Sequence, residues 1–217
     1  MERRDTSMLP RYMFSLGPAF KRWRLLRGIK QLHAAQIIGV GQSTISRWES
    51  DELVLDEKYD AAVMHVLGAR LTSAQDAVLA RLIKSSSKPM HLVCDLSHRL
   101  LAFSESRGVE FGPDAQALLG HSLWQYATEE IVEAEEQVRR QGWNAQNGSV
   151  QFCTGHNHSS VVPIYDSLCT WTRLTLSDGT FARLVETECV PEGERSTHIL
   201  CVDEHEPQLL ECKKSEG

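Results

Sequence analysis

The side chains best suited to recognise another molecule lie together in residues 42–47, which read Gln-Ser-Thr-Ile-Ser-Arg. If this segment is helical, Ile45 and Trp48 face the core, and the polar side chains with the arginine form the exposed face. Such a helix can enter the major groove of DNA, where glutamine suits adenine and arginine suits guanine. The exposed face that could meet the bases there carries Gln42, Ser43, Thr44 and Arg47.

Several helices must hold this polar face in place. Phe20, Trp23 and Leu26 recur at helical spacing, and Gly28 is suited to end the helix that carries them. Gly39 likewise predicts the end of a second helix, which spans residues 31–38. Three further predicted helices span residues 42–50, 56–71 and 74–83.

Residues 24–49 resemble the Xre/Cro-type helix-turn-helix of bacterial and phage repressors, and the resemblance covers about residues 17–71. It implies that the polar face described above reads bases. It also implies that Gln31 grips a phosphate through its side chain and its backbone N–H. Charge and polarity beside that helix end would add phosphate contacts. These contacts are expected from Arg22, Arg24, Arg27, Lys30 and Ser46.

Three positions depart from the family's pattern. Asp51 stands where the family has glycine after the recognition helix, and it brings negative charge near the DNA. Leu25 and Leu32 stand where the family has charged or polar residues. Exposed leucines there indicate either packing against another element or ordinary scattered surface leucines.

Charge is divided unevenly along the 217 residues, whose formal net charge is −6. Residues 1–50 carry +6, residues 51–88 carry −1 and residues 89–217 carry −11. This asymmetry predicts two modules with different partners, the first of which contacts phosphates. The stretch Lys84-Ser-Ser-Ser-Lys-Pro89 interrupts helical periodicity and predicts the linker between them.

Downstream of this linker the periodicity becomes that of strands. Residues 90–104 alternate as a hairpin would, residues 114–140 are helical, and strand-rich segments follow at 149–155, 159–165, 167–176 and 180–190. The Asp178-Gly179 pair predicts a tight hairpin turn.

Residues 90–190 resemble a divergent PAS domain. The resemblance rests on the hairpin at 91–104, the short helix at 115–124 and the Asp178-Gly179 hairpin. It implies a five-stranded antiparallel sheet with helices on one face, which binds a small molecule, haem or flavin, or dimerises and docks partners. The predicted fold is therefore multidomain, with an all-α five-helix helix-turn-helix domain followed by an α+β PAS-like domain.

The predicted boundaries follow from these segments. They are a basic N-terminal arm (1–15), the helix-turn-helix domain (16–71), a connecting helix with the Ser-rich linker (72–89), the PAS-like domain (90–190) and an acidic C-terminal tail (191–217) with one strand at 198–202.

Cofactor chemistry has few candidate residues. The six cysteines include no CxxC pair, which favours reduced thiols over a disulfide framework. Cys153, His156 and His158 have side chains that suit zinc or haem iron, but no second ligand pair is evident, so we expect a polar turn and no cofactor. The alternative is a haem or small-molecule ligand of the PAS-like domain. For that alternative, His91, His98 and His121 are candidate axial ligands, and Trp124, Tyr126, Trp143, Phe152 and Trp171 could line a pocket instead of a core.

The sequence shows no GxSxG, no phosphate-binding glycine loop and no HExxH, so we expect no enzyme. It has no apolar run of about 18–20 residues and no signal peptide, which predicts a cytoplasmic protein. The helix-turn-helix resemblance implies a bacterial protein that is bound to the nucleoid when on DNA. The leading hypothesis is a sequence-specific transcription regulator that reads a palindromic operator as a homodimer. The alternatives are a protein-interaction adaptor that uses the acidic half, and a haem or small-molecule sensor.

Overall fold

The computed structural model describes residues 16–140, 148–189, 199–203 and 206–210, and the predicted arm at 1–15 lies outside them. Five helices form the first part of the chain, as predicted: α1 (Leu16–Leu26), α2 (Gln31–Ile38), α3 (Gln42–Glu49), α4 (Glu57–Leu67) and α5 (Ala74–Lys84). Helix α4 ends at Leu67 and not at residue 71, because Gly68 is extended (φ −63°, ψ 122°) and the next N–H, of Ala69, donates to Cys94 Sγ.

Small residues allow the first three helices to pack closely. Ala34 and Ala35 of α2 are 0% and 2% exposed, next to the buried Ile45 and Trp48 of α3. A Cβ at Gly17 of α1 would lie 1.8 Å from the Trp48 carbonyl oxygen, so only glycine fits at this crossing. The packing leaves the opposite side of α3 exposed to solvent.

Seven antiparallel strands form one sheet in the order β2-β1-β5-β4-β3-β6-β7. They are β1 (Met90–Cys94), β2 (Leu100–Phe103), β3 (Ser149–Cys153), β4 (Ser167–Thr175), β5 (Phe181–Cys189), β6 (Ile199–Asp203) and β7 (Glu206–Leu210). The first five make up the predicted five-stranded antiparallel sheet. Strand β6 lies where the strand at 198–202 is predicted, and β7, which the sequence analysis does not predict, extends the sheet through the segment expected to be a tail.

Residues 159–165 are a loop and not the predicted strand. Asn157 Oδ1 accepts hydrogen bonds from the N–H groups of Ser159 and Ile164, and Ser159 Oγ accepts from those of Val161 and Val162. These side chains satisfy the backbone locally and so replace the hydrogen bonds of a strand ladder. The strand prediction is therefore wrong at this segment.

Side chains alternate along the strands and give the sheet two different faces. Leu92 and Ala182 point to one face, where α5 packs on β1 and β2, and they share a core with Phe20 of α1. Val93 and Val185 point to the other face. That face is covered by α6 (Glu105–Phe111), the 3₁₀ helices η1 (Ala115–Leu118) and η2 (Trp124–Tyr126), and α7 (Glu129–Arg140). Helices thus cover both faces, whereas the PAS resemblance implies one.

A network of buried charges joins α7 to the sheet. Asp95, in the turn after β1, accepts hydrogen bonds from Arg173 Nε at 3.0 Å and from Arg183 Nε at 2.9 Å. Arg183 also pairs with Glu135 of α7, and His98 Nε2 lies 3.6 Å from the Glu135 carboxylate. All five side chains are buried, and Arg183 is 1% exposed. Because each charge has an opposite neighbour, the network can stay in the core.

Candidate functional site

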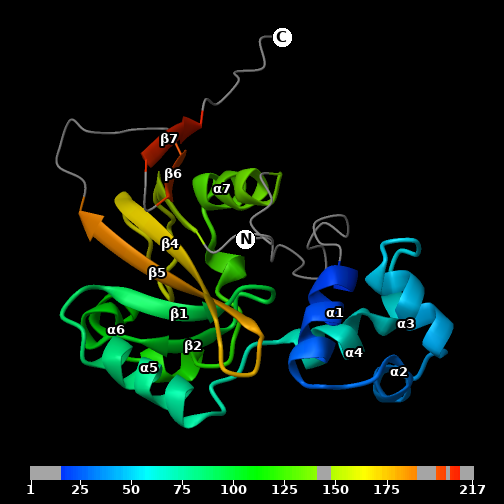
Figure 1. The fold of residues 1–217 in the computed structure, drawn as a ribbon. Coiled ribbons are helices and arrows are strands. Elements are labelled where there is room, and N and C mark those ends of the chain that lie inside the picture. The colour runs from blue at the N-terminus through cyan, green and yellow to red at the C-terminus, as the bar shows by residue number, and fades with distance from the viewer. Residues whose placement is uncertain (1–15, 141–147, 190–198, 204–205, 211–217) are drawn as a thin grey trace.

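The exposed face of α3 carries the side chains predicted to read bases. Gln42, Ser43 and Arg47 are exposed and Thr44 is half-buried. Figure 1 shows α2 and α3 at the end of the molecule away from the sheet. DNA contacts by these four side chains stay a prediction, but the face of α3 on which they lie is exposed to solvent.

A chain of hydrogen bonds links this face of α3 to the last turn of α1. Gln42 Nε2 donates to Gln31 Oε1 at 3.1 Å, and Gln31 Nε2 donates to Glu49 Oε2 at 3.0 Å. Glu49 in turn receives two hydrogen bonds from Arg24, at 2.5 and 2.8 Å. Burial favours the neutral form of Glu49, but the hydrogen bonds from Arg24 and Gln31 hold its pKa below the ordinary value. The charged pair therefore orients Gln31 and, through it, Gln42.

Three of the predicted phosphate ligands have partners within the protein, although Arg22 and Arg27 are exposed. Arg24 is buried on Glu49, so its position does not fit a phosphate contact. Arg27 pairs with Asp178 of the β4–β5 turn at 2.8 Å, and the Arg22 guanidinium lies 4.8 Å above the Phe181 ring. These partners lie far away in the sequence, which is why the sequence analysis could not find them. The other three candidates, Gln31, Lys30 and Ser46, lie near the N-terminus of α2 or on the exposed side of α3.

The departures from the family pattern have structural counterparts. Asp51 adopts φ 58°, a left-handed conformation that glycine favours and that aspartate tolerates. Leu25 and Leu32 are 59% and 62% exposed, so packing against another described element does not cover them. They are surface leucines in this chain.

Comparison with protein families agrees with this geometry. The family model for helix-turn-helix proteins matches residues 20–57, which include the part of α1 from Phe20 onward, the whole of α2 and α3, and the turn between α2 and α3. The match supports a DNA-binding regulator of transcription as the class of this protein. A comparison with curated proteins finds no match.

The β4–β5 hairpin connects the helix-turn-helix to the sheet. Asp76, near the start of α5, accepts hydrogen bonds from the Ser177 N–H at 3.1 Å and the Ser177 hydroxyl at 2.8 Å. Burial would raise the pKa of Asp76, but these hydrogen bonds and those from Ser73 lower it. Together with the Arg27–Asp178 pair, they attach one hairpin turn to α5 and to the residue that follows α1.

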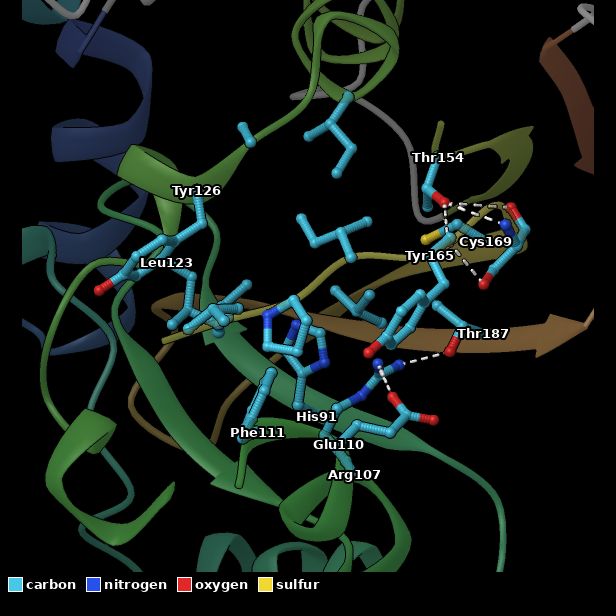
Figure 2. A pocket seen from close by; sticks show the side chains of 18 of the residues that line it. His91, Arg107, Glu110, Phe111, Leu123, Tyr126, Thr154, Tyr165, Cys169 and Thr187 are labelled. Carbon is cyan, nitrogen blue, oxygen red and sulfur yellow. Dashed lines mark hydrogen bonds and ion pairs between the residues drawn. The ribbon is translucent and has the colours of Figure 1, made fainter. Parts of the chain in front are cut away.

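A cavity of about 280 Å³ lies between the other face of the sheet and its covering helices. Trp124, Tyr126 and Trp171, weighed above as pocket or core residues, all line it; Phe152 packs in the core, and Trp143 lies outside the described residues. Figure 2 shows Arg107 of α6 at one wall, joined to Glu110 and Thr187.

Burial sets the protonation of two cavity groups. It lowers the pKa of His91 well below the ordinary value, helped by the charge of Arg107. It also raises the pKa of the Cys169 thiol to about 12. At neutral pH both groups are therefore uncharged. The sequence analysis did not mark Arg107, because its partner Thr187 lies on a distant strand.

The metal candidates are not brought together. Among residues 16–140, 148–189, 199–203 and 206–210, no group of three or more His, Cys, Asp or Glu side chains is placed to hold a metal ion. The rings of His156 and His158 lie 5.3 Å apart, and Cys153 does not join them in such a group. Of the haem candidates, His91 and His98 line the cavity and His121 is exposed. No helix in the described part of the chain is long and apolar enough to span a membrane.

We expect stability to fall on acidification in two stages. The folded pKa of His91 is depressed, so the unfolded chain binds an extra proton once the pH drops below about 6.5. The pKa values of Glu49, Asp76 and Glu135 are also depressed, so a second and larger loss is expected below about pH 4.5. Urea denaturation at a series of pH values measures both stages. His91→Phe should remove only the first stage, and an unchanged profile would contradict its assignment.

Proposed function

We infer that this protein is a sequence-specific transcription regulator that binds operator DNA through α3. The observation that carries the proposal is the exposed polar face of α3 over the buried Ile45 and Trp48. Glutamine and arginine on such a face match the hydrogen-bonding groups of adenine and guanine in the major groove. The helix-turn-helix match at residues 20–57 supports the same conclusion.

The backbone of DNA would be held by fewer residues than the sequence predicted. Lys30 is exposed just before α2, where backbone N–H groups also favour an anion. Gln31 and Ser46 complete the proposed phosphate contacts. Arg24 has a positioning role instead, because it holds Glu49 and so orients Gln31.

We assign the protein to a homodimer on a palindromic site. One α3 helix reads only a few base pairs, whereas two related by a two-fold axis read half-sites about 34 Å apart. The proposed location is the bacterial cytoplasm, and the proposed role is binding and not catalysis. The sheet region is the proposed PAS-like sensor, since its β4–β5 hairpin contacts α1 and α5 and its other face encloses a cavity.

Fluorescence anisotropy of the full chain tests the DNA-binding role. The probes are a duplex enriched by the wild-type protein from a randomised pool and an unrelated duplex. Arg47→Ala is expected to weaken binding to the enriched duplex by about 1–3 kcal/mol, or ~5- to 150-fold, because a base contact is lost. Lys30→Ala should weaken binding to both duplexes alike. It should also reduce the slope of log affinity against log salt concentration by about 1.

Arg81→Ala is the matched control, since Arg81 is an exposed arginine on α5, which packs on the sheet. It should leave affinity for both duplexes unchanged. If Arg47→Ala and Gln42→Ala both bind the enriched duplex as the wild type does, α3 is not the reading helix.

A further inference from the structure

The cavity on the sheet has the size and lining of a small-molecule site. Its volume of about 280 Å³ is close to the lower end of the range for small-molecule pockets, roughly 300–1,000 Å³. The floor is formed by alternate side chains of β1, β4 and β5, and the cover by α6, η2 and the loop before β4. Aromatic rings make up much of the wall, contributed by Phe111, Trp124, Tyr126, Tyr165 and Trp171. Rings of this kind favour a flat apolar molecule that can stack on them.

Polar atoms without a protein partner occur in the same wall. Arg107 Nε, His91 Nδ1 and His98 Nδ1 are buried and have no hydrogen-bond partner in the described part of the protein, whereas His98 Nε2 faces the Glu135 carboxylate. Buried polar groups are nearly always satisfied, so a group of them around one cavity indicates a missing partner. Arg107 Nε–H can only donate a hydrogen bond. The missing partner must therefore present an acceptor to Arg107.

The contacts of Arg107 show which acceptor fits. Its Nη1 donates to Glu110 at 2.5 Å and its Nη2 donates to Thr187 at 2.5 Å, while Arg107 itself is 7% exposed. The Glu110 side chain is 33% exposed and lies only three residues from Arg107 on α6. Its carboxylate can turn toward solvent and leave the guanidinium to another carboxylate, the group that arginine binds best.

The neighbouring groups do not oppose an anion. The Cys169 thiol stays protonated because burial raises its pKa to about 12, so no thiolate repels a carboxylate. His91, held neutral by burial, can donate a hydrogen bond through a protonated Nδ1. Figure 2 shows His91 and Phe111 next to Arg107, so an aromatic surface adjoins the cation.

We propose that this cavity binds a small aromatic carboxylate, with the ring among the aromatic side chains and the carboxylate on Arg107. The proposed ligand gives the sheet region's sensor role a substrate class. Only the expectation that the ligand changes DNA binding rests on that proposed role. A ligand in the cavity would also lie next to the buried charge network of the protein. Arg183 and His98 line the cavity and belong to the network that includes Asp95 and Glu135.

Isothermal titration calorimetry of the full chain, without DNA, tests the proposal. The probes are 2-naphthoate, benzoate, the neutral 2-naphthalenemethanol and inorganic phosphate. We expect 2-naphthoate to bind one per chain and phosphate not to bind. Arg107→Met should weaken 2-naphthoate at least about tenfold and affect 2-naphthalenemethanol less, because only the carboxylate uses the lost charge. Glu110→Gln should strengthen 2-naphthoate, since a competing carboxylate is gone.

Two further variants keep the result interpretable. Val162→Phe fills the cavity without changing charge and should abolish binding of both naphthalene probes, with circular dichroism verifying the fold. Arg140→Met, at an exposed ion pair on α7, should bind as the wild type does. The proposal is overturned if neither carboxylate binds the folded wild type, if phosphate binds as tightly as 2-naphthoate, or if Val162→Phe leaves binding unchanged.

DNA anisotropy with and without 2-naphthoate separates the two proposals. If the wild type binds no DNA in the absence of 2-naphthoate, the regulator role is overturned and the calorimetric result still stands. Absence of naphthoate binding, with normal DNA binding, would overturn only the cavity inference.

Discussion

Replacement of Arg183 by alanine is expected to lower the free energy of unfolding by about 3–5 kcal/mol, because it removes the guanidinium that pairs with two buried carboxylates. Arg183 is 1% exposed and holds both Asp95 and Glu135, each 0% exposed. Arg173 still compensates Asp95, but Glu135 loses the guanidinium that pairs with it, and His98 lies 3.6 Å away. The guanidinium also lies 4.2 Å above the Trp171 ring, a packing contact that alanine cannot replace.

Urea denaturation followed by tryptophan fluorescence measures this loss. Arg140→Ala is the matched control, because its ion pair with Glu136 is 75% and 44% exposed and should be worth at most about 1 kcal/mol. The double variant Arg183→Met/Glu135→Leu removes one buried charge of each sign and should recover much of the stability. Equal effects of Arg183→Ala and Arg140→Ala would show that the buried network does not stabilise the fold.

Replacement of Glu49 by alanine is expected to cost about 3 kcal/mol of stability and to reduce affinity for the enriched duplex. Arg24 would keep its buried charge without the carboxylate that balances it. The expected cost lies at the lower end of the range for broken buried pairs, because the Arg24 side chain is still 11% exposed. DNA affinity falls as well, since Gln31 loses the acceptor that orients it beside Gln42.

Both effects of Glu49→Ala can be separated by measuring anisotropy at a temperature where the variant is folded. Glu49→Gln retains a hydrogen-bond acceptor and should lose less of both stability and DNA affinity. Glu188→Ala is the control, because the Lys88–Glu188 pair is 60% and 61% exposed. A Glu49→Ala variant as stable as Glu188→Ala would mean that the Arg24–Glu49 pair contributes nothing to the fold.

Elements with a strong local pattern could be predicted from the sequence. The five N-terminal helices and the β4–β5 hairpin lie where periodicity and turn residues place them. The prediction failed at residues 159–165, where β-branched residues suggest a strand but Asn157 and Ser159 satisfy the backbone as a loop. It also missed β7, whose pairing with β6 extends the sheet.

The polar face of α3 is determined by the sequence itself, because the helical repeat alone separates Ile45 and Trp48 from Gln42 and Arg47. What the arginines of α1 do is decided only by the tertiary structure. Arg24 meets Glu49 across 25 residues and Arg27 meets Asp178 across 151 residues, so no local spacing could reveal that Arg24 is buried in an ion pair or that the exposed Arg27 has a carboxylate partner. The cavity has the same origin, since Arg107 and Thr187 become neighbours only when α6 packs on β5. Periodicity decides which side of an element is buried, and long-range packing decides which charges remain at the surface.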